Sequence, residues 1–312
     1  MSKIDAVVRY SLIIHKLKSV YDSHKSNQNV ISFEEFQDYF RSQDLESRGV
    51  KLDVSRRTFQ RDISEIRSLF DLEIEYCFGE RGYRLKESDI SYGSDLGMRM
   101  LEALDMVNVM SYDNGFRPFM QFEYRRSLGS EYLMPLLQAC KQVKEVDVAY
   151  QSFYKSYLEN KTIQPYYVKE YEHRWYLIGV SKEHGALRTY ALDRFRGVEI
   201  TKKTFKDEKR TEYDKYFEDS FGIFGPTEYP AEEVILEFNA QQGKFVKSLP
   251  LHHSQEVVFE DNEKVVIRYK INITHDFIME ILSYGPWVKV VSPLRLIEEV
   301  KNKYRDSLNQ YD

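Results

Sequence analysis

The sequence predicts an α+β multidomain protein built from several compact units. Its 312 residues exceed the roughly 100–200 expected of one domain, which favours two or three units with separate cores. Apolar residues first recur at helical spacing, then fall into short β-rich runs after Val143, and finally alternate between strand-like and helix-like segments after Glu233. These changes of pattern predict an N-terminal helical unit, a central β-rich unit and a mixed C-terminal unit.

Composition excludes several classes of protein. Hydrophobic residues make up 42% and charged residues 30%, as in an ordinary globular protein. No apolar run approaches the roughly eighteen residues that span a bilayer, and the N-terminus lacks the apolar core of a secretory signal, so a cytoplasmic protein is expected. Cys77 and Cys140 are too few for a disulfide framework or a zinc knuckle. The net charge of -5 argues against general coating of nucleic acid, so any such contact must be local.

Two predicted helices open the N-terminal unit. Apolar residues between positions 8 and 17 recur at helical spacing and are followed by a polar loop. Ser32 and Glu35 have the spacing of a capping box, in which a serine and a glutamate satisfy each other's free backbone amides at a helix start. Phenylalanines at positions 33, 36 and 40 continue the pattern. The segment predicts a helix, a loop and a second, amphipathic helix.

The third predicted helix, at residues 54–70, is the most informative segment. Ser55 is a favourable N-cap, and apolar residues at positions 59, 63, 66 and 70 form one stripe that can pack on the earlier helices. The opposite face crowds polar side chains into the first turns, where a recognition helix meets the major groove of DNA. Arginine suits guanine edges and phosphates, and glutamine suits adenine. The predicted DNA-contacting residues of this helix are Ser55, Arg56, Arg57, Thr58, Gln60 and Arg61.

A short hairpin is predicted after the third helix. Residues 72–76 and 83–85 have the pattern of strands, with glycines at the bend. On this hairpin, Arg81 and Tyr83 complete the predicted DNA-contacting set. An arginine-rich helix face alone also suits an ordinary solvated surface. The capping serine, the apolar stripe and the hairpin together favour the DNA-binding interpretation.

The order of helix, helix, arginine-rich helix and hairpin resembles the winged helix-turn-helix of the DeoR-like regulators. Their recognition helix often carries the pattern Ser-x-Arg-Thr-x-x-Arg-Asp-Leu. In this chain isoleucine replaces the leucine, and the matching residues are Ser55, Arg57, Thr58, Arg61 and Asp62. The resemblance implies that residues 1–90 form an N-terminal winged helix-turn-helix that binds duplex DNA.

Residues 91–142 are predicted to form a helical linker. Apolar residues at positions 96, 100, 104 and 107 have helical spacing, and a further helix is predicted at 132–143. Helices between a DNA-binding head and a sensor commonly help dimerisation or transmit movement. Simple packing helices explain the pattern equally well, so both interpretations stay open.

The central unit, residues 143–204, consists of short β-rich runs that predict a small barrel. It resembles the WYL domain family, which is named after the tripeptide Trp-Tyr-Leu present at residues 175–177. Pro165 precedes the tripeptide, and the run at residues 188–194 follows it in the expected order. The resemblance implies an SH3/Sm-like β-barrel that senses a ligand.

The resemblance also implies an anionic or nucleic-acid ligand at the tyrosine of the tripeptide and the basic residues of the last strands. In an extended strand, side chains of equal parity point to one face, where guanidinium groups suit phosphate and an aromatic ring suits a base. The predicted ligand-binding residues are Tyr176, Arg188, Tyr190, Arg194 and Arg196. Leu192 interrupts this polar face, and arginines satisfied by local carboxylates or carbonyl groups are the alternative. The expected effector is phosphate-bearing, either a nucleotide or a short single-stranded nucleic acid, with a simple metabolite as an alternative.

Residues 205–230 are predicted to be a polar linker with one short helix, and residues 231–312 a C-terminal domain. Its order of strand, helix, strand, strand, helix and strand predicts a ferredoxin-like α/β domain, followed by a last helix with Pro293 at its first position. The apolar face of this helix consists of Ile297, Val300, Tyr304 and Leu308. The region resembles the WCX extension that often follows WYL domains. The best-matching residues are Gly285, Val288, Val290, Ser292 and Pro293.

No pattern in the sequence favours an enzyme. It contains no recognisable nucleophile with its base, metal cluster or phosphate-binding loop. His252 and His253 are adjacent, but they lack cysteine or carboxylate ligands at a familiar spacing and are interpreted as a loop. No catalytic residue, cofactor or metal is therefore expected.

The predicted function is ligand-responsive regulation of transcription. One winged helix covers only a short half-site, so a homodimer on an inverted repeat of operator DNA is expected, with contacts from the linker helices or the C-terminal domain. The alternative is an accessory protein that binds single-stranded nucleic acid through its WYL domain and modulates a nuclease or helicase. The arginines of the third helix favour the regulator.

Overall fold

The computed structural model describes residues 3–24, 30–43, 52–70, 72–86, 128–226 and 229–311, together with residues 102–103, 106, 119 and 121. Contacts divide the chain into two compact units, Met1–Phe122 and Glu123–Asp312. The helix predicted at positions 96 to 107 lies almost entirely outside the described residues. No helix within the described ranges combines the length and apolar character that a membrane span needs.

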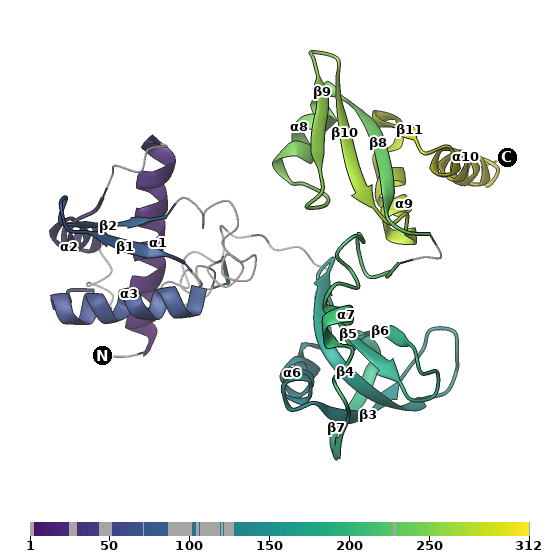
Figure 1. Ribbon diagram of the computed structural model, residues 1–312, viewed down its shortest axis with the longest axis horizontal. Helices are drawn as coiled ribbons and strands as arrows, with labels where there is room; N and C mark the ends of the chain where they lie inside the picture. Colours follow the sequence, from purple (N-terminus) through teal and green to yellow (C-terminus); the bar gives the residue numbers. More distant parts are fainter. Residues whose placement is uncertain are drawn as a thin grey trace. The chain divides into compact units, whose positions relative to one another are not determined.

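The N-terminal unit contains three helices and a hairpin, in the predicted order. In Figure 1 these elements are α1 (Lys3–His24), α2 (Phe33–Ser42), α3 (Arg56–Phe70), β1 (Ile74–Cys77) and β2 (Gly82–Leu85). The two strands pair antiparallel, with Ile74 opposite Leu85. Tyr83 and Ile31 also exchange backbone hydrogen bonds of 2.8 and 2.9 Å. The segment before α2 therefore adds a short third partner to the hairpin.

Local sequence signals start the second and third helices as predicted. At α2, the amide of Glu35 donates to Ser32 Oγ at 3.2 Å and the amide of Ser32 donates to Glu35 Oε2 at 2.7 Å, which completes the capping box. At α3, the amide of Thr58 donates to Ser55 Oγ at 3.2 Å, so Ser55 is the N-cap. The buried apolar stripe of α3 consists of Phe59, Ile63, Ile66 and Phe70.

A buried ion pair fixes α3 against α1. Arg9 Nε donates to Asp62 Oδ2 at 2.7 Å, and neither side chain is exposed. The pair compensates two charges that water does not reach, and removing one partner of such a pair costs about 3–5 kcal/mol. The hydroxyl of Tyr10, the next residue, donates to Glu65 of α3. Asp62, one of the residues that match the DeoR-like pattern, is thus a core residue rather than part of the exposed face.

The first half of the second unit is a five-stranded antiparallel sheet with one covering helix. Its elements are η3 (Ser130–Tyr132), α6 (Leu133–Gln142), β3 (Lys144–Tyr150), β4 (Glu159–Tyr171), β5 (Arg174–Ser181), β6 (Leu187–Ala191), η4 (Leu192–Arg194), β7 (Phe195–Thr204) and α7 (Arg210–Asp214), and Figure 1 labels the α-helices and strands among them. The strand order is β6-β5-β4-β3-β7. Leu136 and Ala139 of α6 are buried in one core with Val146 and Leu177 of the sheet. This helix was predicted as part of the linker, whereas its apolar side belongs to the core of the sheet.

The second half of this unit is a four-stranded antiparallel sheet with the order β11-β8-β10-β9. Its elements are β8 (Glu232–Asn239), α8 (Ala240–Ser248), β9 (Glu256–Glu260), β10 (Lys264–Ile271), α9 (His275–Ser283), η5 (Gly285–Trp287), β11 (Val288–Ser292) and α10 (Leu294–Leu308), and Figure 1 labels the α-helices and strands among them. Strands and helices follow one another as predicted. Val246 of α8, Phe277 of α9 and Leu296 of α10 pack into one core with the sheet.

The last helix differs from the prediction in two details. It starts one residue later than predicted, so Pro293 is the N-cap rather than the first helical residue. Leu296 and Val300 are its buried side chains, whereas Tyr304 and Leu308 are 40% and 65% exposed. The predicted apolar face is therefore buried only near the start of the helix.

Candidate functional site

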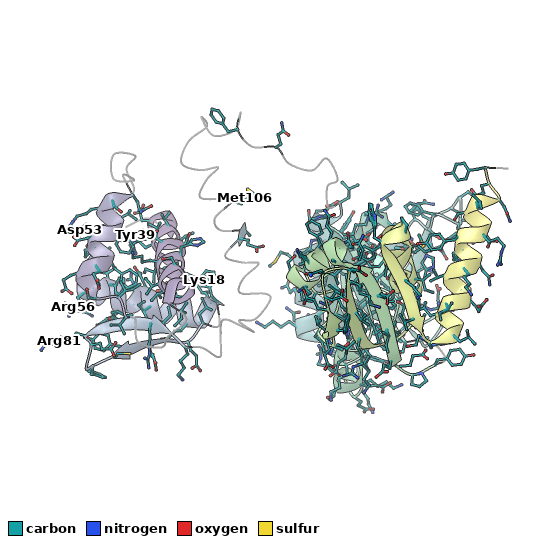
Figure 2. The ribbon with its side chains drawn as sticks, turned by 90° about the horizontal axis from the view of Figure 1, so that it is seen from above. Lys18, Tyr39, Asp53, Arg56, Arg81 and Met106 are labelled. Carbon is teal, nitrogen blue, oxygen red and sulfur yellow. The ribbon has the colours of Figure 1, made fainter. Side chains whose placement is uncertain are left out.

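The exposed face of α3 carries most of the predicted DNA-contacting residues. Thr58 is half-buried, and the exposed residues are Ser55, Arg56, Arg57, Gln60 and Arg61. The helix has four arginines against two acidic residues, and one of the latter, Asp62, is buried with Arg9. The exposed surface of α3 therefore carries a larger excess of positive charge than the residue count of the helix indicates. Figure 2 shows Arg56 and Arg81 of the hairpin on the same side of the N-terminal unit.

The arginines of this face differ in the partners that hold them. Arg56 Nη2 donates to Glu34 Oε1 at 2.5 Å. Arg61 Nε lies 3.7 Å from Glu65 Oε1. Arg57 has no hydrogen-bond or ion-pair partner among the described residues. All its donors are therefore available to a ligand.

A pocket of about 360 Å³ lies between α3 and the hairpin. Arg56, Gln60 and Arg81 line it together with aromatic side chains. Tyr83, predicted to contact DNA, is 6% exposed and its ring centroid lies 5.3 Å from that of Phe59, so it is mainly a core residue. Burial raises its pKa, and its hydroxyl shares a hydrogen bond with Gln60. The ring of Tyr83 therefore belongs to the core, and only its hydroxyl reaches the polar side chain of Gln60.

The turn of the hairpin exposes a residue that sequence reasoning missed. Phe78 is 86% exposed, and Arg81 in the same turn is exposed and has a φ of 55°. Arg84 Nε lies 2.5 Å from Glu75 Oε1, and this ion pair between the two strands stabilises the hairpin. The available signal was an aromatic residue beside turn glycines, where no core position is expected.

The strand pairing contradicts the predicted single ligand-binding face of the WYL region. In the β5–β6 ladder, Tyr176 lies opposite Ala191, and Gly179 lies opposite Arg188. Cross-strand partners share a face and faces alternate along a strand, so Tyr176 and Arg188 lie on opposite faces of the sheet. Tyr190 is 6% exposed and belongs to the core beneath α6. Arg188 and Tyr190 share one face, as the parity predicted, but Tyr176 lies on the other, so the predicted grouping of Tyr176 with Arg188 is not found.

The reason is a break in the strand. β6 ends before Leu192, and the 3-10 helix η4 separates it from β7, so the parity of Arg188 does not continue to the later arginines. Arg196 Nη1 donates to the carbonyl oxygens of Asp193 and Phe195 at 3.1 and 2.9 Å. Arg196 therefore fits the alternative of an arginine satisfied by local carbonyl groups.

Arg194 retains the features of a binding residue. It is half-buried, and its guanidinium carbon lies 4.0 Å from the centroid of the Phe153 ring. It also forms a hydrogen bond with Tyr150, whose pKa is raised by burial and lowered in part by this arginine. Within the described chain, its Nε is buried without a hydrogen-bond partner. Such unsatisfied groups are rare in folded proteins and are candidates for contact with a ligand or water.

Asp193 and Arg174 extend the site at Arg194. Arg174 Nη1 lies 3.5 Å from Asp193 Oδ2, while Asp193 Oδ1 is buried and has no hydrogen-bond partner in the described part of the chain. Burial raises the pKa of Tyr176, and the charges of all three residues act on its hydroxyl. Arg174, Asp193 and Arg194 therefore form one polar cluster, which we call the η4 site, and their charges reach the hydroxyl of Tyr176.

The β3–β4 loop adds aromatic rings that the sequence analysis also missed. Phe153, Tyr154 and Tyr157 are 70%, 94% and 60% exposed. Gln151 Nε2 donates to the carbonyl oxygen of Lys155 at 2.8 Å, which helps to order the loop. An aromatic surface beside a guanidinium group suits a nucleobase and its phosphate.

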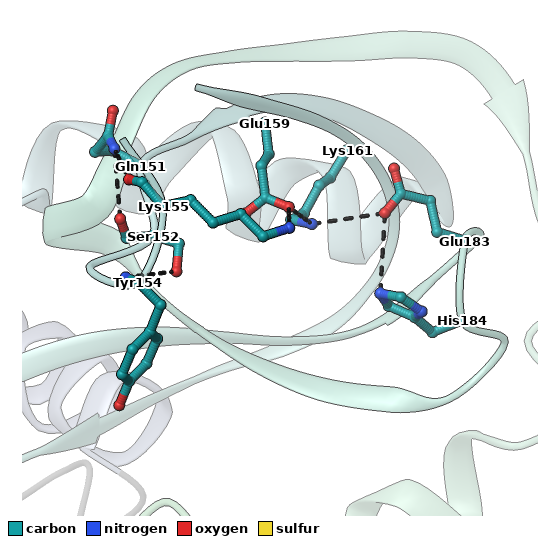
Figure 3. Close-up of polar contacts among 8 residues, drawn as sticks. All are labelled: Gln151, Ser152, Tyr154, Lys155, Glu159, Lys161, Glu183 and His184. Atoms are coloured by element: carbon teal, nitrogen blue, oxygen red, sulfur yellow. Dashed lines mark hydrogen bonds and ion pairs between the residues drawn. The ribbon is translucent and has the colours of Figure 1, made fainter. Parts of the chain in front are cut away.

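A second basic residue of this region is already neutralised (Figure 3). Lys161 Nζ lies 3.0 Å from Glu159 Oε1 and 3.6 Å from Glu183 Oε2, and its side chain is 9% exposed. Burial lowers the pKa of Lys161, but the hydrogen bond with Glu159 and the charges of both glutamates outweigh it and raise the pKa overall. Lys155 also pairs with Glu159 at 2.6 Å. This network braces the sheet and leaves little charge for an anion.

The buried side of Tyr176 faces a connecting segment, residues 217–224. Tyr176 is 8% exposed and packs with Phe217 and Ile223. The amide of Ile223 in turn donates to Asp276 Oδ2 at 2.7 Å, at the start of α9. One face of the tripeptide strand is thus joined through this segment to the C-terminal half of the unit.

His252, the first of the two adjacent histidines, is held by hydrogen bonds within the structure. His252 Nε2 donates to the carbonyl oxygen of Glu218 at 2.9 Å, and its Nδ1 accepts from the amide of Ser254 at 3.2 Å. Both ring nitrogens are therefore used. Within the described ranges, no three His, Cys, Asp or Glu side chains gather as metal ligands.

Comparison with protein families identifies two domains in the chain. Residues 131–200 match the WYL domain, and residues 230–308 match the WCX domain. The first match includes α6, in agreement with the packing of this helix on the sheet. No curated protein matches the chain.

Two solved structures are similar to the chain. Proteasome accessory factor B/C (PafBC) of Arthrobacter aurescens is 17% identical with a TM-score of 0.33, and the match covers 95% of this chain and 45% of that one. The chain thus spans less than half the length of the PafBC structure. A CRISPR Cas-related protein is 14% identical with a TM-score of 0.40, and the match covers 97% of this chain and 91% of that one. The domain assignment depends on the family matches rather than on these likenesses.

Proposed function

We propose that the protein is a ligand-responsive transcription regulator. Residues 1–90 act as a winged helix-turn-helix, with α3 as the recognition helix and β1–β2 as the wing. The observation that carries this proposal is the exposed face of α3, where Arg57 lacks an intramolecular partner among the described residues and Gln60 is held by Tyr83. Such side chains on a helix of this kind read guanine and adenine edges in the major groove.

The WYL domain is proposed as the sensor, with a phosphate-bearing ligand at the η4 site. Arg174 and Arg194 offer guanidinium donors for phosphate, and Phe153 offers a ring for a base. Occupancy of the site changes the DNA affinity of the head. Linkage then requires that operator DNA changes the ligand affinity by the same factor. No catalytic step is part of this proposal.

The regulator is proposed to act as a homodimer on an inverted repeat, because one recognition helix covers a short half-site. Light scattering at micromolar concentration is expected to give twice the chain mass. A monomeric mass, together with one protein per operator, would contradict the dimer without touching the proposal for α3.

Fluorescence anisotropy with duplex DNA from upstream of the protein's own gene tests the regulator. The full-length protein should hold a specific duplex in excess competitor DNA. Binding of single strands with no specific duplex would instead favour an accessory protein for a nuclease or helicase. Titration with ATP and with a short thymidine oligonucleotide, with and without the duplex, measures the coupling. Equal ligand affinity in both conditions would leave a binding site without a switch.

A further inference from the structure

The η4 turn is in direct backbone contact with the segment that enters the WYL domain. Gly129, just before η3, has a φ of 83°, in the left-handed region that favours glycine. A Cβ at this position would lie 2.7 Å from the amide nitrogen of Asp193 and closer still to the carbonyl group of Leu192. Real Cβ atoms essentially never approach backbone atoms this closely. Glycine is therefore required here by the neighbouring turn as well as by its own conformation.

A second contact lies beside this one. The rings of Tyr132 in η3 and Phe195, the first residue of β7, are 5.8 Å apart between centroids. The amide of Tyr132 donates to the carbonyl oxygen of Gly129 at 3.1 Å, which holds the two contacts together. Gly129 thus contacts the turn at Leu192, just before Asp193. Tyr132 contacts Phe195, just after Arg194.

The same turn carries the unsatisfied polar atoms of the η4 site. Asp193 Oδ1 and Arg194 Nε are buried and have no hydrogen-bond partner in the described residues. A phosphate that accepts a hydrogen bond from Arg194 Nε is therefore held by a residue of this three-residue turn. Close-packed contacts transmit a shift of the turn because they leave no free space to absorb it.

We infer that Gly129 and Tyr132 are positioning residues that couple the η4 site to the N-terminal head. Residues 128–132 lie at the start of the WYL match and follow the N-terminal unit in the chain, so a shift of η4 acts on the segment that leads to that unit. This inference rests on the proposed function, because it names the contact through which ligand occupancy reaches DNA binding.

The first test compares Gly129→Ala with Gly185→Ala in the full-length protein. Both glycines have a left-handed φ, 83° and 62°, so both variants carry similar backbone strain, but a Cβ at Gly185 meets nothing within 4 Å. Gly129→Ala should change the affinity for the upstream duplex by at least about fivefold, in the range of allosteric coupling, and Gly185→Ala should leave it unchanged. Equal duplex affinities of both variants and the wild type would overturn the inference.

The second test needs neither DNA nor ligand. Arg194→Ala should accelerate hydrogen exchange of the amides in η3 and the first turn of α6, whereas Arg188→Ala on β6 should not. Unchanged exchange in the Arg194 variant would overturn the inference even if Gly129→Ala failed to fold. If the wild-type protein bound no duplex, the regulator proposal would be contradicted. The exchange result would still test whether η4 is coupled to η3.

A third variant separates coupling from packing. Tyr132→Ala should reduce the factor by which duplex DNA changes the affinity for the thymidine oligonucleotide, and Tyr132→Phe, which keeps the ring, should restore it. Restoration of thermal stability without restoration of this factor would indicate a merely structural role for the ring and contradict the inference.

Discussion

The arginines of α3 and those around η4 are held in different ways. On α3 they lie on one side of an amphipathic helix whose other side is buried, and Arg57 projects without a described partner. Around η4, Arg194 is half-buried between Phe153 and Tyr150, and Arg196 donates to main-chain carbonyls. The first arrangement offers several exposed cations to an extended, highly charged partner. The second offers a few partly desolvated donors to a small group.

This difference predicts different behaviour for the two proposed interactions, DNA binding at α3 and ligand binding at the η4 site. Exposed cations act through counterion release and lose affinity steeply as salt rises. Donors in a partly buried site are less screened and depend more on geometry. Single substitutions on α3 should therefore lower the affinity for DNA in small steps. Substitutions at the η4 site should either abolish ligand binding or leave it unchanged.

The largest effect is expected where the α3 surface depends on the core beneath it. Asp62→Ala removes the carboxylate that compensates the buried Arg9 guanidinium. The N-terminal unit should lose about 3–5 kcal/mol of stability, and DNA binding should fail because α3 is no longer fixed. Urea-dependent hydrogen exchange of the α3 amides measures this.

The matched control is Asp38→Ala. Asp38 pairs with Arg41 at 3.1 Å, but the two side chains are 77% and 61% exposed, so its loss should leave the stability nearly unchanged. Equal effects of the two variants would show that the buried pair contributes no more than a surface pair.

The η4 site should respond to single arginines selectively. Arg194→Ala should weaken binding of ATP or the thymidine oligonucleotide by about 1.5–3 kcal/mol, the range for hydrogen bonds to charged groups. Arg188→Ala, on the face of β6 opposite Tyr176, should leave it unchanged. Titration calorimetry decides between them. A larger loss from the Arg188 variant would move the site to the other face of the sheet.

The smallest and most graded effects are expected on α3. Arg57→Ala should weaken duplex binding by about 1–3 kcal/mol if it reads a base, or lower the salt slope by roughly one if it contacts a phosphate. Arg56→Ala should have less effect, because Arg56 already donates to Glu34. Anisotropy titrations at several salt concentrations measure both. The α3 proposal fails if neither Arg57→Ala nor Arg61→Ala changes affinity or slope.

Sequence reasoning predicted the exposed face of α3 better than the η4 site. Helical periodicity runs unbroken through α3, so the stripe at Phe59 and Ile63 defines the opposite face without knowledge of the fold. Strand parity carries the same information only while the strand continues. It failed after Ala191 because η4 interrupts the strand, and it did not show that Tyr190 points into the core.

Tertiary contacts also changed the roles of residues that sequence patterns had grouped together. Tyr83 was predicted to meet DNA but packs on Phe59, and Asp62 matched a recognition pattern but is buried with Arg9. The exposed rings of Phe78 and Phe153 were missed, because an aromatic residue in a polar loop has no periodicity that assigns it to a face.

By itself, the sequence determined the element order, the caps at Ser32 and Ser55, and the location of the WYL and WCX domains. The element order and the caps depend on residues within a few positions of one another, where backbone geometry fixes the outcome, whereas the two domains were located by their resemblance to known families. Only the tertiary structure decided which arginines are free, which face of the sheet Tyr176 occupies, and that Gly129 touches η4. Those outcomes depend on contacts between residues that are far apart in the chain, as Arg9 and Asp62 are. No local sequence pattern indicates which distant residues meet.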